Sequence, residues 1–104
     1  MDQDLVVRMA DIEIDPLHLD AYRHLLAEEI EASVNIEEGV ISLNAVSITD
    51  CPEKIRILEI YASPAAYEAH LQTPHFLKYK AATAAMVRSL TLIDVEPVIL
   101  RSKS

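Results

Sequence analysis

The chain has 104 residues, 51% of them hydrophobic, and a formal net charge of −8 at pH 7. This length and apolar content fit one domain over residues 1–104 with a single core, and they exclude a disordered chain. The acidic balance argues against nucleic acid as a partner, because phosphate backbones are bound by basic patches.

Residues 1–39 predict a strand followed by a long helix. The strand covers residues 4–14, DLVVRMADIEI. Asp15-Pro16 then combines a helix cap with a proline at the first helical position. The helix is expected to end near Gly39, the only glycine of the sequence, since glycine suits a left-handed helix terminus. Apolar residues repeat at helical spacing through this helix: Leu19, Tyr22, Leu26, Ile30 and Val34.

Residues 40–62 predict a β-hairpin. Residues 40–49 and 54–62 are rich in β-branched and other apolar side chains, which is typical of strands. The polar segment Asp50-Cys51-Pro52-Glu53 between them predicts the turn.

Two closely spaced helix starts follow the hairpin. Serine or threonine followed by proline combines an N-cap with a preorganised first helical residue, and this pair occurs at residues 63–64 and 73–74. The elements expected here are helices over residues 64–72 and 74–89 and a last strand over residues 91–101.

The order of these elements is β-α-β-β-α-β with the second helix broken in two. This order predicts an α+β fold of the ferredoxin-like, split β-α-β kind with an antiparallel sheet. Residues 40–46 and 90–100 carry apolar side chains at both parities, so the sheet face away from the helices is expected to be covered as well. A second copy of the chain is the expected cover, which predicts a homodimer. Pro97 in the last expected strand suggests an edge, a bulge or a crossing into that partner.

Three features of the sequence favour a cytoplasmic location. No apolar run approaches the roughly 20 residues that cross a bilayer, so no membrane partner is expected. The first residues are acidic where a secretory signal peptide carries basic ones. The single cysteine, Cys51, excludes an internal disulfide framework and fits a reducing compartment.

The sequence lacks the motifs that identify a reaction on their own. It has no glycine-rich phosphate loop, no CxxC, no HExxH and no serine flanked by glycines, and it contains no tryptophan. A metal site shared by His70 and His75 is not expected, because the helix break at Thr73-Pro74 separates them and no acid or cysteine stands close in sequence.

His70 and His75 are nevertheless the first candidates for chemistry. His70, in the short predicted helix, is either a buried imidazole bonded to a backbone carbonyl or a proton acceptor, since imidazole titrates near neutrality. His75, in the first turn of the next helix, is either a surface residue or lies at a pocket rim where free N–H groups favour an anionic group.

Asn44 and Arg8 are polar residues in otherwise apolar strands. The amide of Asn44 is either bonded across the sheet or aimed at a ligand, and both alternatives stay open. Arg8 either pairs with Glu59 on another strand or stabilises an anionic intermediate.

The remaining candidates have structural interpretations. The four tyrosines are expected in the core with satisfied hydroxyls. The acids of the long helix and of its end are expected to be solvated surface residues. These two sets are Tyr22, Tyr61, Tyr67 and Tyr79, and Glu28, Glu29, Glu31, Glu37 and Glu38.

Two segments, EEGVISLNAV at residues 37–46 and KIRILEIYASPAAYEAHLQTPHFLKY at residues 54–79, resemble the antibiotic biosynthesis monooxygenase domain family. The most specific part runs from Ala69 to Phe76 and is supported by Glu59-Ile60-Tyr61. Within the family, the chain is most similar to the small quinol monooxygenases and to their relative, the autoinducer-2 phosphate processing enzyme. The resemblance covers essentially the whole chain.

The resemblance implies a dimeric α+β barrel with a pocket between the sheet and the helices of each subunit. It also implies oxidation of a small quinol or phenol-like aromatic with dioxygen, without flavin, metal or haem as a cofactor. On this resemblance His70 is expected as the base or the oxyanion partner, with Asn44 and Tyr22 orienting the substrate. The expected substrate-binding residues are Arg8, Tyr61, His75, Phe76 and Tyr79.

The sequence departs from parts of the family. Some family monooxygenases carry a tryptophan at the position that aligns with His70, and the haem-degrading branch adds an asparagine in the first strand and an axial histidine. Here those positions are Arg8 or Met9, His70 and Lys80, so haem degradation is disfavoured. Two other functions stay open: an isomerase or proton-transfer enzyme acting on a small phosphorylated diketone, and a non-catalytic dimeric module that binds a small molecule.

Overall fold

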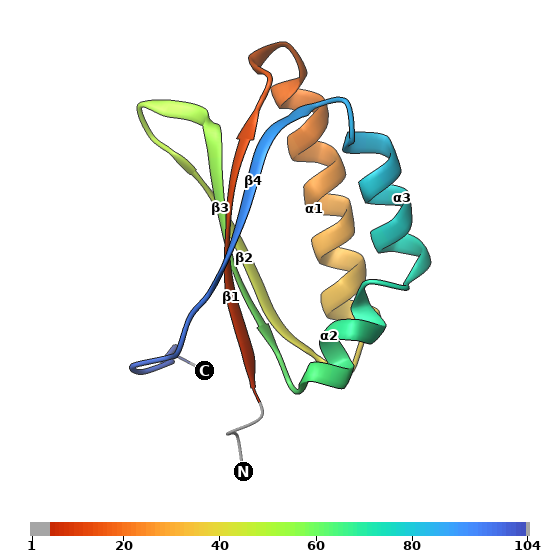
Figure 1. Cartoon of the computed structure of the whole chain (residues 1–104), viewed down its shortest axis with the longest axis vertical. Coiled ribbons are helices and arrows are strands. Elements are labelled where there is room, and N and C mark those ends of the chain that lie inside the picture. Colours follow the sequence, from red (N-terminus) through yellow and green to blue (C-terminus); the bar gives the residue numbers. More distant parts are fainter. Residues whose placement is uncertain (1–4, 104) are drawn as a thin grey trace.

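A computed structural model describes residues 5–103 of the chain (Figure 1). Strands and helices follow one another in the order predicted for a split β-α-β fold. The elements are β1 (Val6–Ile14), a 3-10 turn (Pro16–His18), α1 (Leu19–Ile36), β2 (Val40–Ile48), β3 (Cys51–Tyr61), α2 (Pro64–His70), α3 (Pro74–Thr83) and β4 (Val87–Asp94).

The four strands form one sheet in the order β2-β3-β1-β4, with antiparallel pairing between all neighbours. All three helices lie on the same side of this sheet, with α1 and α3 side by side and α2 near one end (Figure 1). This arrangement confirms the predicted α+β, ferredoxin-like fold.

Helix α1 buries one face against the sheet. Its buried residues, Tyr22, Leu26, Glu29 and Ser33, recur every three or four positions, which is the spacing of one helical face. Val34, predicted on this face, is exposed. The chain enters α1 through the 3-10 turn, which is capped by the Asp15 carboxylate accepting the Leu17 N–H at 3.0 Å.

Gly39 has a different role from the predicted one. Helix α1 ends at Ile36, and Gly39 does not adopt a positive φ. Instead, a Cβ at position 39 would collide with the Cβ of Ala66 in α2. The glycine therefore permits the close approach of α2 to the start of β2.

The predicted boundaries of α3 and β4 were wrong by several residues. The alanine-rich segment after Lys80 predicts helix through residue 89, but α3 ends at Thr83 and β4 begins at Val87. Pairing with β1 decides this boundary, because Val87 and Leu90 lie opposite Ile14 and Ile12 in the sheet. Strand β4 ends at Asp94, so Pro97 lies outside it and does not interrupt the sheet.

The predicted turn at residues 50–53 is also shorter than expected. Cys51 already belongs to β3 and pairs with Ile48, after a register shift between Ser47 and Ile48. Pro52 therefore lies inside the strand, next to this irregular pairing, where a missing N–H is tolerated.

A second register shift, between Val40 and Ser42, inverts the side-chain parity along β2. Val40 and Leu43 are consequently both buried on the helix-covered face. Asn44, which strict alternation from Val40 would place on the same face, lies on the opposite face and is exposed.

The face away from the helices carries apolar side chains in register. Met9 lies between Leu58 and Ile93, and Ile93 keeps 45% of its surface exposed. Cover of this face by a second copy of the chain stays a prediction. Within residues 5–103, no helix combines the length and the hydropathy that a bilayer crossing requires.

A candidate active-site pocket between the sheet and the helices

A cavity of about 550 Å³ lies between the helix-covered face of the sheet and the three helices. Its walls are mainly apolar, as in most small-molecule sites. The apolar lining includes Ala10, Ile12, Leu26, Ile57, Phe76 and Leu92. The polar lining is a small set of residues: Tyr22, Glu29, Glu59, Tyr61, Tyr67, His70, Tyr79, Lys80 and Thr83.

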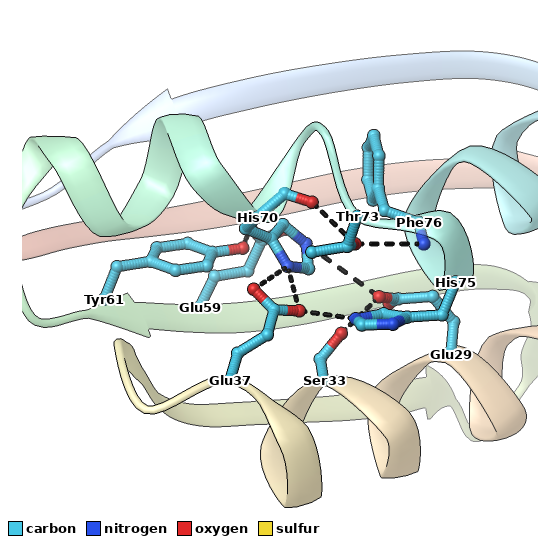
Figure 2. A network of polar contacts seen from close by, with 9 residues as sticks. All are labelled: Glu29, Ser33, Glu37, Glu59, Tyr61, His70, Thr73, His75 and Phe76. Atoms are coloured by element: carbon cyan, nitrogen blue, oxygen red, sulfur yellow. Dashed lines mark hydrogen bonds and ion pairs between the residues drawn. The ribbon is translucent and has the colours of Figure 1, made fainter.

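His70 is the last residue of α2 and is only 3% exposed. The helix is fixed at its start by Ser63, whose hydroxyl accepts the Ala66 N–H at 3.0 Å. At its end, the Thr73 hydroxyl donates to the His70 carbonyl oxygen at 2.9 Å and accepts the Phe76 N–H at 3.2 Å. Thr73 thereby ties the end of α2 to the start of α3 directly beside the imidazole (Figure 2).

Glu37, just after α1, holds the imidazoles of both His70 and His75 (Figure 2). His70 Nδ1 lies 3.0 Å from Glu37 Oε2 and 3.3 Å from Oε1, and His75 Nε2 lies 2.6 Å from Oε2. An ionised carboxylate only accepts hydrogen bonds, so both imidazole nitrogens donate to it. In neutral His70 the proton is therefore on Nδ1, and Nε2 is left as an acceptor.

The two imidazoles in turn affect the carboxylate. Burial on its own would raise the pKa of Glu37, but the hydrogen bonds from His75 and His70 outweigh it, and the pKa is lowered. Glu37 is thus held as an anion between two imidazoles.

His70 Nε2 faces Glu29 across a gap. The distance from Nε2 to Glu29 Oε2 is 3.9 Å, too long for a hydrogen bond. Glu29 is 6% exposed and accepts the hydroxyl of Ser33 one turn along α1. Nε2 is consequently free to accept a hydrogen bond from a ligand.

Glu59 lies on the sheet side of the cavity, between the buried residues Ile57 and Tyr61 along β3. The Tyr61 hydroxyl donates to Glu59 Oε1 at 2.7 Å. Burial raises the pKa of Glu59 above its ordinary value, against the opposing hydrogen bond from Tyr61 and the charge of Arg8. This carboxyl group therefore holds a proton more strongly than a solvated glutamate does.

Tyr22 and Tyr79 form a pair across the cavity wall. Their hydroxyl oxygens are 2.5 Å apart, and their ring centroids are 6.0 Å apart. Burial raises the pKa of both phenols, so both stay un-ionised near neutral pH.

Arg8 lies next to the pocket rather than in its lining. It sits opposite Glu59 in the β1–β3 register, but its charge pairs with Asp94, with Nε 2.9 Å from Oδ1. The predicted Arg8–Glu59 ion pair is therefore wrong. Arg8 Nη1 donates to the Tyr67 hydroxyl at 2.8 Å, and the guanidinium lies 4.4 Å from the centroid of the Tyr67 ring.

The structure brings together some of the predicted site residues and separates others. Within residues 5–103, the polar contact of His75 is with Glu37, and Asn44 lies on the far face of the sheet. Arg8 acts on the lining through Tyr67. The predicted residues that do line the cavity are Tyr22, Tyr61, His70, Phe76 and Tyr79.

Two acids were assigned wrongly from the sequence. Glu29 and Glu37 were expected to be solvated, but Glu29 is buried and the side chain of Glu37 is 11% exposed. The spacing of Glu29 from Tyr22 and Leu26 could have indicated its burial, since it places all three on one helical face. Glu37 had no such indication in its spacing, because its partners lie more than thirty residues away.

Among residues 5–103, no group of three or more histidine, cysteine, aspartate or glutamate side chains is arranged to hold a metal ion. The imidazole nitrogens that meet Glu37 do so as hydrogen-bond donors.

The fold and the pocket define a class: ferredoxin-like α+β proteins whose helices enclose a cavity on one face of an antiparallel sheet. The family model described as antibiotic biosynthesis monooxygenase matches residues 5–82. The chain belongs to this family, as its sequence resemblance indicated. No curated protein matches the chain.

Solved structures of other proteins share the fold. A candidate antibiotic biosynthesis monooxygenase from Bacteroides thetaiotaomicron is 47% identical, with a TM-score of 0.97 over 99% of this chain and 100% of that chain. A candidate monooxygenase from Lactobacillus acidophilus is 27% identical, with a TM-score of 0.85 over 88% of this chain and 43% of that one. A protein from Nitrosomonas europaea, 17% identical with a TM-score of 0.85 over 91% of each chain, shows the fold alone. The family and the first two of these structures support a monooxygenase-like function.

Proposed function

We propose that the protein is a cofactor-independent monooxygenase that oxidises a small quinol or phenol-like aromatic with dioxygen. The observation that carries this proposal is the state of His70. Its imidazole is buried at an apolar cavity, its Nδ1 is bonded to Glu37, and its Nε2 is free to accept a proton.

The chemistry needs a base and a dry site more than it needs a cofactor. A quinol that loses a proton becomes an electron-rich anion that can pass electrons to dioxygen directly. One oxygen atom then adds to the ring, the other leaves as water, and the quinol, which becomes a hydroxyquinone, supplies all the electrons. Exclusion of bulk water protects the reactive intermediates.

His70 is the group that takes the first proton, through Nε2. The imidazolium that forms is stabilised by Glu37, which already accepts the Nδ1 proton. Tyr22, Phe76 and Tyr79 provide aromatic wall against which a planar ring can pack.

The assembly and location that accompany this function are also proposals. The apolar side chains on the uncovered sheet face support a homodimer. Cys51 is a free thiol, which supports the cytoplasm as the location.

The test is oxygen consumption by the purified protein with a panel of hydroquinones, with a chelator present and with autoxidation blanks. We expect saturable uptake that falls by about 10²-fold or more in His70→Ala, the usual contribution of a general base. The matched control is His24→Ala, which removes an exposed histidine of α1 and should keep the rate. Mass spectrometry with labelled dioxygen should place one labelled atom in the product.

Absence of uptake above the blank across the panel would contradict the proposal. Turnover of a phosphorylated diketone under nitrogen would then identify an isomerase. Tight binding of an aromatic without any turnover would identify a non-catalytic binding module.

A further inference from the structure

The hydrogen-bonding groups around the cavity include acceptors that receive no hydrogen bond within residues 5–103. Tyr22 and Tyr79 share one hydrogen bond, which uses only one of their two hydroxyl protons, and the Tyr61 hydroxyl donates to Glu59. The unused groups include the acceptor Nε2 of His70 and the oxygen Oε2 of Glu59, to which no hydrogen bond comes from residues 5–103. The cavity therefore offers a ligand hydroxyl two acceptors, His70 Nε2 and Glu59 Oε2.

The charges around the cavity also disfavour an anionic ligand. Its lining contains two acids, Glu29 and Glu59, and one cation, Lys80, which is exposed to solvent. The nearby cation Arg8 lies behind Tyr67 and has its charge paired with Asp94. An anion placed in the cavity would meet two carboxylates in a weakly screened environment.

Glu59 is the better placed of the two acids to bind a ligand. Glu29 already accepts the Ser33 hydroxyl, whereas Glu59 has one internal donor, Tyr61, on one of its two oxygens. The ionisable groups that act on Glu59 come from β1 (Arg8), α1 (Glu29) and α2 (His70), and the un-ionised phenols of Tyr22 and Tyr79 also lie within its electrostatic reach. Burial without a full set of donors is the condition under which a carboxyl group recruits a hydroxyl from its ligand.

We infer that Glu59 is the specificity-determining residue of the pocket: its free oxygen accepts a hydroxyl of the ligand, so the site binds un-ionised hydroxylated aromatics and rejects anions, phosphorylated compounds included. This inference rests on the proposed function for the aromatic class of the ligand. It adds the protonation state in which the ligand binds, and it identifies Glu59 as the residue that distinguishes this state from the ionised one. When one hydroxyl of a quinol donates a hydrogen bond to Glu59, its second hydroxyl stays free to donate to His70.

The test uses 4-nitrophenol, whose phenol and phenolate forms have different absorption spectra, with binding measured under nitrogen. The affinity of the wild-type protein is determined at pH values on both sides of the ionisation of the probe. Because a hydrogen bond to a charged group is lost and a repulsion is gained, the phenolate should bind about tenfold more weakly than the phenol. By linkage, the pKa of the bound probe should rise by about one unit.

Glu59→Gln, which has the same shape and no charge, should bind the two forms with nearly equal affinity. Glu68→Gln is the matched control, since it removes one negative charge from an exposed position of α2 and should leave the discrimination intact. Unsubstituted phenol, which stays un-ionised over the same pH range, corrects for titration of the protein itself.

Equal binding of phenol and phenolate by the wild-type protein would overturn the inference, even if Glu59→Gln does not fold. Absence of binding of either form, or unchanged discrimination in folded Glu59→Gln, would also overturn it. The result is separable from the proposed function, because binding is measured without dioxygen. Discrimination without oxygen uptake would leave the inference standing and remove the monooxygenase proposal.

Discussion

Glu37 joins two imidazoles that belong to different helices, and this single carboxylate sets the state of the site. Its oxygens accept from His70 Nδ1 and His75 Nε2, so they fix the tautomer and the ring orientation of His70. Within the described part of the chain, the polar contact of His75 is with this shared partner. Glu37 is therefore a positioning residue, although it does not line the pocket.

Glu37→Gln should lower the free energy of unfolding near neutral pH by about 1–3 kcal/mol, the cost of losing a charged acceptor from buried donors. The pKa of Glu37 is lowered in the folded protein, so its stabilising effect is present above the ordinary value of 4.5 and is lost as the pH falls through the folded value. The difference between wild type and variant should consequently shrink below about pH 4.5. Urea unfolding at a series of pH values measures it, and a difference that stays constant into acid would contradict this account.

Whether the role of a single residue could be predicted depends on how far away in the sequence its partners lie. Tyr22 could be placed on the buried face of α1 from the local helical pattern, and the family resemblance assigned Tyr22 and Phe76 to the pocket. The environment of Glu37 could not be predicted, because its two partners come from a segment that folds against the end of α1 only in the tertiary structure.

Helix α2 is the element that delivers His70, and its position depends on two local features. Ser63-Pro64 fixes its start, and the absent side chain of Gly39 lets it approach β2. The starts of α2 and α3 were predictable because caps act within a few residues. The ends of α1 and α3 were not, because sheet pairing and packing of distant segments decide them.

Gly39→Ala should destabilise the protein by about 1–3 kcal/mol, the usual cost of overpacking, because the new methyl group meets Ala66. The double variant Gly39→Ala/Ala66→Gly should recover most of this loss, since the φ of Gly39 is not positive and alanine is tolerated there. Thermal unfolding measures both. Failure of the double variant to recover would show that the cost comes from the backbone rather than from the collision.

At the scale of the whole molecule, one face of the sheet is covered by helices and the other bears apolar side chains. The mixed parity of residues 40–46 and 90–100 led to the prediction of a covered outer face. The structure explains part of that mixture differently, because the register shift in β2 turns Val40 and Leu43 to the same side. Sequence patterns do not report such a shift, since it depends on the pairing partner.

The predicted homodimer is tested by Ile93→Lys, which places a charge on the outer face beside Met9. We expect the substitution to shift the molar mass in solution from that of a dimer to that of a monomer, because burial of an unpaired lysine is costly. Leu77→Lys, on the exposed side of α3, is the matched control and should leave the mass unchanged. Light scattering coupled to gel filtration measures it, and a wild-type protein with the mass of a single chain would contradict the prediction.

Leu90 and Leu92 have a further consequence for the route by which a ligand arrives. Both belong to the edge strand β4 and line the cavity, yet 43% and 46% of their surfaces remain exposed. The cavity of the single chain is therefore open beside the sheet margin, and a ring can enter there without unfolding of a helix. A substituent on that ring, such as a hydrocarbon tail, can trail outwards over the two leucines. The pocket would then select the ring of a ligand closely and would tolerate substituents of very different length on that ring.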